Sequence, residues 1–252
     1  MSKLDVIITY NRLFRNMAYA SCSTLKNENI FVHLNYVEIS TKNNSGFQSS
    51  SWYECLRKKI CFAENILRDL QENDVLCVAD ADIYYIQPDK IYDLKSYMQN
   101  SNIEFIGGTE NLSDYPTKKN QGKLNCGFFL IKKTENTKSF FVDILNYNFS
   151  DYDFGEQDII NNLVVKNKIN SEILSPIDFP MGCYIDWSTS QKKTPVYFMH
   201  STCTANLKEK EKQIDDLINY YNLPKVKWFR TPLTKKEYAL YIDGKLQYDT
   251  RQ

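Results

Sequence analysis

Apolar stretches of strand length alternate with helical patterns along the first hundred residues. Short, β-branched apolar runs at 4–10, 30–39 and 74–79 predict strands. Between them, residues 13–25 and 52–70 carry apolar side chains at helical spacing. Strands that alternate with helices are typical of βαβ units and of a mainly parallel sheet. The pattern therefore predicts an α/β protein, in which 74–79, without polar alternation, is a central strand covered on both faces.

Shorter elements of the same kind continue through the rest of the chain. We expect helices at 89–98, 139–145, 155–165 and 208–221, and strands at 103–107, 126–132, 169–174 and 196–199. Polar stretches at 41–51 and 111–123 predict loops, and the first is the better candidate for a segment that moves over a ligand. Asp243 and Gly244 predict a tight hairpin near the C-terminus. No linker is evident, so we expect one α/β domain at 1–222, with an extension at 223–252 packed on it.

The charge balance and the scarcity of glycine narrow the class of protein. The 252 residues include 31 Lys and Arg against 31 Asp and Glu, which argues against a nucleic-acid protein with a broad basic surface. With only eight glycines, neither G-x-x-x-x-G-K-[ST] nor G-x-G-x-x-G occurs, so the common nucleotide-binding loops are absent. No run of 18 apolar residues predicts a transmembrane segment. The seven scattered cysteines favour a reducing, cytoplasmic location.

Two carboxylates follow the expected strand 74–79. Asp80 and Asp82 are two positions apart, so both side chains would point to the same side of an extended chain. Carboxylates this close repel each other unless a cation joins them. Mg²⁺ and Mn²⁺ prefer oxygen ligands and often bind one or two carboxylates together with substrate phosphates. Because open α/β sheets bind ligands at the carboxyl ends of their strands, this position supports a metal site. The alternative is a D-x-D that occurs by chance in a loop.

A histidine ends the late apolar stretch 196–200. His200 stands where that strand would leave the sheet, and an imidazole there could complete the coordination of Mn²⁺, which accepts nitrogen more readily than Mg²⁺ does. The alternative is a core or surface histidine without a ligand. Lys208 follows in a segment able to fold back over an anionic ligand; by itself it is equally a solvated helix residue.

Five short motifs in a fixed order give the chain a resemblance to a known family. It resembles the GT-A nucleotide-diphospho-sugar transferases, above all the group with the plant-type xylosyl- and arabinosyltransferases. The resemblance spans about residues 4–208, and its motifs are Lys58-Lys59, Asp80-Ala81-Asp82, Asn125-Cys126-Gly127-Phe128-Phe129, Glu156-Gln157 with Asn161, and His200. The motif does not distinguish the two lysines. The resemblance implies a GT-A fold, a Rossmann-like and mostly parallel sheet flanked by helices.

The resemblance also implies how such a site would hold its donor. Asp80 and Asp82 would bind the divalent metal and the ribose or phosphate of the sugar nucleotide. His200 would be the third protein ligand of the metal. Thr9 and Tyr10, at the end of the first strand, would contact the base and the ribose.

Further roles follow from the same motifs. Lys59 would approach the donor and Lys208 its diphosphate. Asn125 and Gln157 would face the sugar or the acceptor near the reacting carbon. Glu156 departs from the aspartate usual in the family, and its longer side chain changes that contact. On local sequence alone, Asn125 fits a strand cap and Glu156 a helix-dipole partner.

The expected activity is metal-dependent transfer of a sugar from a nucleotide-diphosphate donor, a UDP-sugar in first place, to a hydroxyl of a glycan acceptor. Inversion would need a base, for which Glu156 and Asp158 are candidates. Retention, toward which the resemblance leans, could use Gln157 or Asn125 to steady an oxocarbenium-like state. Two alternatives remain open: a non-catalytic module that binds sugar nucleotides or glycans, and a metal-dependent phosphoryl-transfer hydrolase, disfavoured because Asp80 lies deep in the chain.

Overall fold

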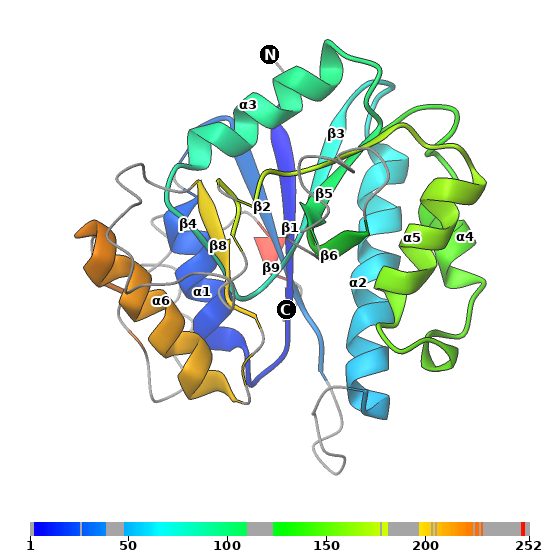
Figure 1. Ribbon diagram of the computed structural model, residues 1–252. Helices are drawn as coiled ribbons and strands as arrows, with labels where there is room; N and C mark the ends of the chain where they lie inside the picture. Colours follow the sequence, from blue (N-terminus) through cyan, green and yellow to red (C-terminus); the bar gives the residue numbers. More distant parts are fainter. Residues whose placement is uncertain are drawn as a thin grey trace.

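The computed structural model has a central β-sheet with helices on both faces (Figure 1). It describes residues 3–25, 27–38, 48–109, 123–176, 178–180, 197–202, 204, 206–223, 225–226, 228 and 248–249. The strands are β1 (Leu4–Tyr10), β2 (Ile30–Tyr36), β3 (Val75–Asp80), β4 (Ile83–Tyr85), β5 (Phe105–Thr109), β6 (Leu124–Lys132), β7 (Ser171–Ile173), β8 (Phe198–His200) and β9 (Tyr248–Asp249). The helices are α1 (Arg15–Thr24), α2 (Ser50–Asp69), α3 (Pro88–Gln99), α4 (Phe140–Leu145), α5 (Glu156–Lys166) and α6 (Leu207–Tyr221), with a short 3₁₀ turn at Phe149–Asp151.

Seven strands form the main sheet in the order β7-β5-β6-β3-β1-β2-β9. β1 runs parallel to β2 and β3, and β5 runs parallel to β7. β6 lies between β3 and β5 and is antiparallel to both. The predicted α/β class and mostly parallel sheet are therefore confirmed, with one reversed strand that the apolar pattern could not distinguish, because a buried strand has the same composition in either direction.

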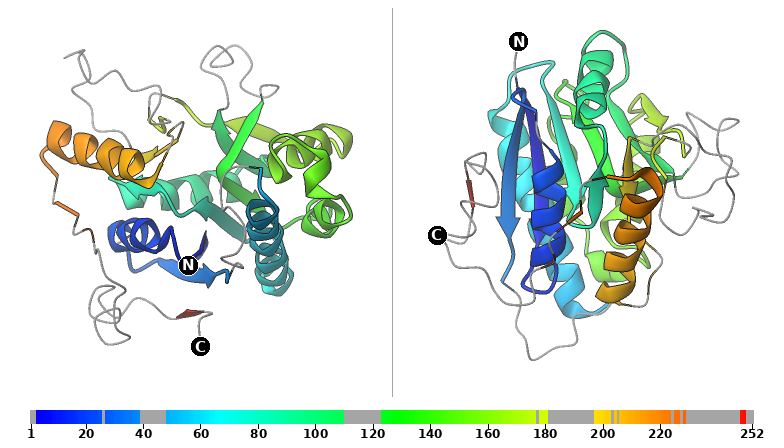
Figure 2. Two further views of the ribbon diagram at one scale, coloured as in Figure 1. Left: turned by 90° about the horizontal axis from the view of Figure 1, so that it is seen from below. Right: turned by 90° about the vertical axis from the view of Figure 1, so that its left-hand side faces the viewer.

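Two apolar layers lie on opposite faces of this sheet. In β3, Val75, Cys77 and Ala79 belong to one buried cluster, and Leu76 and Val78 belong to the other. The first cluster packs α1, α3 and α6 together with the small β4-β8 sheet, and the second packs α2, α4 and α5 (Figures 1 and 2). The prediction that this strand is covered on both faces is thus confirmed.

The ends of several elements depend on single side chains. The helix predicted at 52–70 begins earlier because the Ser49 hydroxyl accepts a hydrogen bond from Trp52 N at 3.2 Å. The Asn11 side chain accepts hydrogen bonds from Leu13 N (2.9 Å) and Phe14 N (3.3 Å), which turns the chain from β1 into α1.

Some predictions fall on residues that the structure does not describe. Most of the loop predicted at 41–51, most of the loop predicted at 111–123, and the hairpin around Asp243 and Gly244 lie outside the described residues. In the last of these regions only Tyr248–Asp249 is described, and it pairs in parallel with β2. The division into 1–222 and 223–252 therefore stays a prediction.

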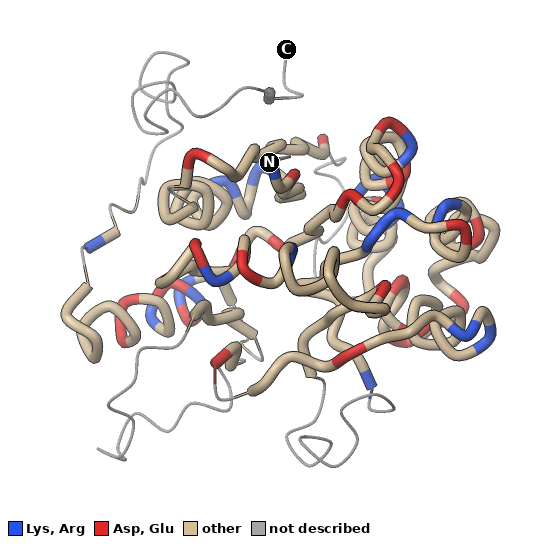
Figure 3. The backbone as a smooth tube through the Cα atoms, turned by 90° about the horizontal axis from the view of Figure 1, so that it is seen from above, with Lys and Arg blue, Asp and Glu red and all other residues tan. Residues whose placement is uncertain are grey.

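Charged residues of both signs are interspersed along the described helices (Figure 3). The equal numbers of acidic and basic residues in the sequence are thus also mixed locally. Within the described part of the chain, no helix combines the length and apolar character needed to cross a bilayer.

Candidate functional site

The two aspartates of the D-x-D motif meet a histidine where β3 leaves the main sheet. Asp80 is the last residue of β3, and Asp82 lies in the turn that leads into β4. β4 pairs with β8 so that Ile83 lies opposite His200. One ligand atom from each of Asp80, Asp82 and His200 lies within 4.8 Å of the others. The three predicted ligands therefore come together, although through a turn and a second sheet rather than along one extended strand.

His200 depends on a glycine of the neighbouring strand. Gly127 lies in β6, and Ala79 pairs with Phe128, so Gly127 is beside the end of β3. A Cβ atom on Gly127 would lie 2.0 Å from Cε1 of His200. The imidazole therefore occupies the space that any other residue at position 127 would fill.

Asp82 is buried between two nitrogen-bearing side chains. Its Oδ2 accepts a hydrogen bond from Lys210 Nζ at 2.5 Å, and its Oδ1 lies 3.3 Å from His200 Nε2. Burial would raise the pKa of this carboxyl, but Lys210 and His200 outweigh it and hold the pKa well below its usual range. Asp82 is thus a carboxylate in the folded protein.

The donor set fits a divalent cation. Among the described residues, the buried Oδ1 of Asp82 accepts no hydrogen bond, and an unsatisfied buried carboxylate oxygen is costly unless a cation or donor meets it. Asp80, whose side chain is 37 % exposed, adds a second carboxylate, and His200 adds a nitrogen. Two oxygens and one imidazole suit Mn²⁺ or Mg²⁺, with room left for phosphate oxygens.

A buried lysine joins the metal-type cluster to α5. Lys59 lies on the buried stripe of α2, and its Nζ is 2.9 Å from Asp80 Oδ1 and 2.6 Å from Glu156 Oε1. Burial would lower the pKa of Lys59, but the two carboxylates outweigh it and raise the pKa above its ordinary value. Burial raises the pKa of Glu156, against the opposing charge of Lys59. Lys58 is instead exposed and pairs with Glu54, so the structure distinguishes the two lysines.

Lys59→Met is expected to lower the free energy of unfolding by about 3 kcal/mol, because it leaves the buried Glu156 without its cation. Lys58→Met, one residue away on the same helix, is the matched control and should change it by less than about 0.5 kcal/mol. Urea unfolding followed by circular dichroism measures both. Equal effects of the two substitutions would contradict the proposed buried ion pair.

Gln157 holds the start of β6 against α5, and Asn125 bonds within β6 itself. Asn125 Oδ1 accepts a hydrogen bond from Gly127 N at 3.1 Å, and Gln157 Oε1 accepts one from Cys126 N at 3.0 Å. Gly155, at φ +53°, turns the chain into α5 in a conformation that suits glycine. Both predicted side chains are therefore fixed beside the end of β3.

The remaining predicted residues, Thr9, Tyr10 and Lys208, lie in different surroundings. Thr9 pairs with Asp80 across β1 and β3, and its hydroxyl accepts a hydrogen bond from Asn35 at 3.2 Å. The Tyr10 side chain is buried in the core and packs against the ring of Tyr36. Lys208 is exposed in the first turn of α6.

Sequence reasoning missed two residues of the site, Lys210 and Gly127. Lys210 stands two positions beyond Lys208 on α6, in a Lys- and Glu-rich run where no pattern singles out one lysine. Gly127 was visible as part of the predicted Asn125–Phe129 motif, and its signal was that a glycine in a strand marks a close approach.

A family model described as nucleotide-diphospho-sugar transferase matches residues 16–214. No curated protein matches significantly.

Solved structures share the fold at low identity. One is a glycosyltransferase involved in the glycosylation of the major capsid of PBCV-1 (8 % identity, TM-score 0.57, 85 % of this chain and 100 % of that chain covered). A second is the apo form of the glycosyltransferase GlyE of Streptococcus pneumoniae TIGR4 (12 %, 0.54, 100 % and 66 %). A third is the apo form of mouse xyloside xylosyltransferase 1 (11 %, 0.50, 82 % and 100 %).

Proposed function

Because the chain belongs to the nucleotide-diphospho-sugar transferase family, we propose that it transfers a sugar from a UDP-sugar to a hydroxyl of a glycan, and that it needs Mn²⁺ or Mg²⁺. The observation that carries the proposal is the cluster of Asp80, Asp82 and His200, with a buried carboxylate oxygen that accepts no hydrogen bond from the described residues. A cation held by this cluster would bind the phosphates, so the chain can bind a nucleotide without a glycine-rich phosphate loop.

In this proposal the residues of the chain divide the work around the donor. When bound at Asp80, Asp82 and His200, the cation would act as a Lewis acid and stabilise the negative charge that develops on the departing diphosphate. Thr9 contacts the ribose, whereas the ring of Tyr10, buried in the core, supports the end of β1 behind it. Lys59 pairs with both Asp80 and Glu156 and keeps their side chains in place.

The charges near the reacting carbon support retention of configuration. Both candidate bases are already ion-paired: Glu156 Oε1 lies 2.6 Å from Lys59, and Asp158 Oδ1 lies 3.2 Å from Lys123. Each carboxylate is therefore oriented by its lysine rather than toward the hydroxyl of an acceptor. Gln157 and Asn125 are then the groups that face the oxocarbenium-like transition state.

The test is release of UDP with and without Mn²⁺, for a panel of UDP-sugars, together with calorimetric binding of UDP. Turnover or slow donor hydrolysis that requires the metal supports the proposal. Metal-dependent UDP binding without any turnover would favour a sugar-nucleotide binding module. The absence of both, with every donor, would reject the proposal.

Lys210→Met is expected to tighten the binding of Mn²⁺ alone by roughly tenfold, about 1.4 kcal/mol, because it removes the ammonium that occupies Asp82 Oδ2. The same substitution should weaken UDP binding in the presence of Mn²⁺, since a cation near the diphosphate is lost. Titration calorimetry measures both affinities. Lys212→Met, which removes an exposed lysine of the same helix, is the control. Weaker Mn²⁺ binding by the Lys210 variant would contradict the idea that Lys210 and Mn²⁺ compete for Asp82.

The boundary of the catalytic domain and the cellular compartment of the protein are also proposals. We propose that residues 1–222 form the catalytic domain, since the family match ends at 214 and α6 ends at Tyr221. A reducing cytoplasmic compartment suits the described cysteines, which are free thiols: Cys22, Cys55, Cys61, Cys77 and Cys126.

A further inference from the structure

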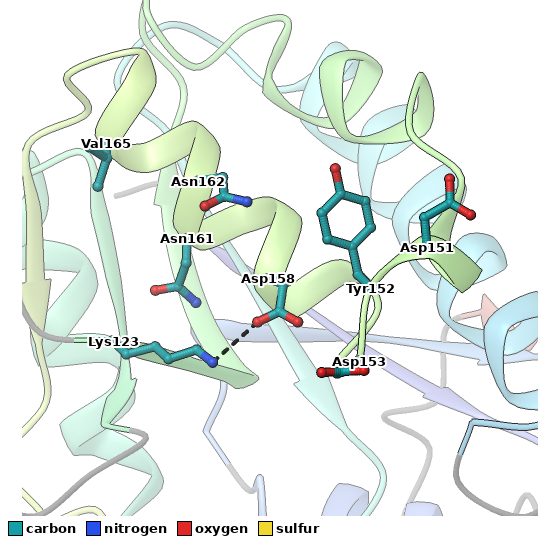
Figure 4. Close-up of a pocket in the computed structure, with 8 residues that line it drawn as sticks. All are labelled: Lys123, Asp151, Tyr152, Asp153, Asp158, Asn161, Asn162 and Val165. Carbon is teal, nitrogen blue, oxygen red and sulfur yellow. Dashed lines mark ion pairs between the residues drawn. The ribbon is translucent and has the colours of Figure 1, made fainter.

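A hollow of about 600 Å³ lies on the solvent side of α5, outside the site described above (Figure 4). Asp158, Asn161 and Asn162 line it from α5, and Lys123 lines it from the residue before β6. Tyr152 and its two aspartate neighbours complete it from the segment that leads into α5. Its volume is that of a small-molecule site.

The lining suits a ligand rich in hydroxyl groups. Carboxylates accept hydrogen bonds, amides both accept and donate them, and the tyrosine adds an aromatic face with a polar tip. Two exposed apolar side chains adjoin these groups. Val165 is 79 % exposed and lines the hollow, and Phe154, 40 % exposed, has Lys123 Nζ 4.9 Å from its ring centre. Mixed polar groups beside apolar patches match a sugar, which has hydroxyls at its edge and C–H groups on its faces.

The hollow adjoins the proposed reaction centre through neighbouring residues of two elements. Lys123 is two residues before Asn125, about 7 Å along the chain, and Asp158 directly follows Gln157. Asn161 joins the two: its side chain bonds to Leu124 N at 2.8 Å and Leu124 O at 2.9 Å. A chain of sugars that leaves the reacting carbon beside Gln157 can therefore follow α5 into the hollow.

The charge of the hollow selects among sugars. Lys123 and Asp158 pair at 3.2 Å, which leaves Asp151 and Asp153 as net negative charge. Acidic sugars would be repelled, whereas neutral sugars and amino sugars would not. Within the described residues, the group of three or more side chains suited to a metal ion is that of Asp80, Asp82 and His200, and Asp151 and Asp153 are not part of it.

We propose that the hollow is a distal subsite that binds neutral or amino sugar units of the glycan acceptor, beyond the unit that receives the sugar. The inference rests on the proposed function, because it assigns the acceptor of that same reaction. It predicts that the enzyme acts on an oligosaccharide rather than on a single sugar.

The test is a double variant, Asp153→Ala with Asn162→Ala, at two exposed positions of the lining. Lys166→Ala, an exposed side chain of the same helix outside the lining, is the matched control. Wild type and variants are applied to an array of neutral, amino and acidic glycans of one to six units, and retained glycans are titrated by calorimetry. Donor hydrolysis without acceptor and thermal unfolding are measured on the same samples.

The inference expects neutral or amino oligosaccharides to be retained and their affinity to fall about tenfold or more in the double variant, because two hydrogen-bonding groups are lost. The control should bind as wild type, and donor hydrolysis should be unchanged in all. An empty array, retention of acidic glycans only, or an affinity that the double variant leaves unchanged would overturn the inference. If donor hydrolysis and UDP binding are absent from wild type, the proposed function itself fails, which separates the two outcomes.

Discussion

Asp82→Asn is expected to lower kcat/KM by about a thousandfold or more, roughly 4 kcal/mol of transition-state stabilisation. The change keeps the shape of the side chain and removes the charge that Lys210 and His200 hold in the carboxylate form. The buried Oδ1 accepts no hydrogen bond from the described residues. In the variant its position would hold either an amide nitrogen, which cannot bind the cation, or an uncharged amide oxygen, which binds it more weakly. Metal-dependent UDP binding should disappear together with turnover, as measured by calorimetry and by UDP release.

The control for this change is Asp216→Asn on α6. Asp216 forms an ion pair with Lys212 at 2.6 Å at an exposed position, so its loss removes an aspartate–lysine pair without touching the cluster. Activity of the control should equal that of wild type. Normal kcat/KM in Asp82→Asn would show that the D-x-D motif does not bind the metal. Thermal unfolding without metal shows whether the Asp82 variant is folded.

Gly127→Ala is expected to abolish the metal dependence of UDP binding, although alanine is the smallest change possible. The new Cβ would lie 2.0 Å from Cε1 of His200, so the imidazole has to leave its place in the cluster. His200 cannot follow easily, because it ends β8, which pairs with β4. Overpacking of this kind also costs about 1–3 kcal/mol in the free energy of unfolding.

Gly108→Ala is the matched control, since it adds the same methyl group to the neighbouring strand β5. The nearest atoms to a Cβ there are 3.6 Å away, which is ordinary contact. Calorimetry of UDP with and without Mn²⁺, and urea unfolding, should distinguish the two variants. The steric argument fails if Gly127→Ala binds UDP with Mn²⁺ as wild type does.

Most of the sheet could be predicted from the sequence because buried strands have few alternatives. The β3 stretch is apolar on both faces, and the structure covers both faces with helices. The reversal of β6 could not be predicted, because its residues 124–132 are as apolar as those of a parallel strand. Direction is set by the connection between strands, and the pattern of apolar residues does not encode it.

The site, too, could be predicted from the sequence only in part. Asp80, Asp82 and His200 were predicted as a group and lie together, and the family resemblance is confirmed by the match over 16–214. Asp80 and Asp82 were predicted to lie on one extended strand, which is wrong, because Asp82 lies in a turn. Lys210 was missed because its contact with Asp82 joins residues far apart in the chain, and no local periodicity reports such a contact.

The position of His200 in the small β4-β8 sheet has a consequence for how the molecule loses activity. Asp80 belongs to the main sheet, whereas His200 reaches it through a ribbon of two three-residue strands covered by α6. Such a ribbon has few ladder hydrogen bonds and can open as a unit of its own while the main sheet stays intact. The cluster can therefore lose His200 while the main sheet stays folded, so activity should be lost at a lower temperature than the global unfolding transition.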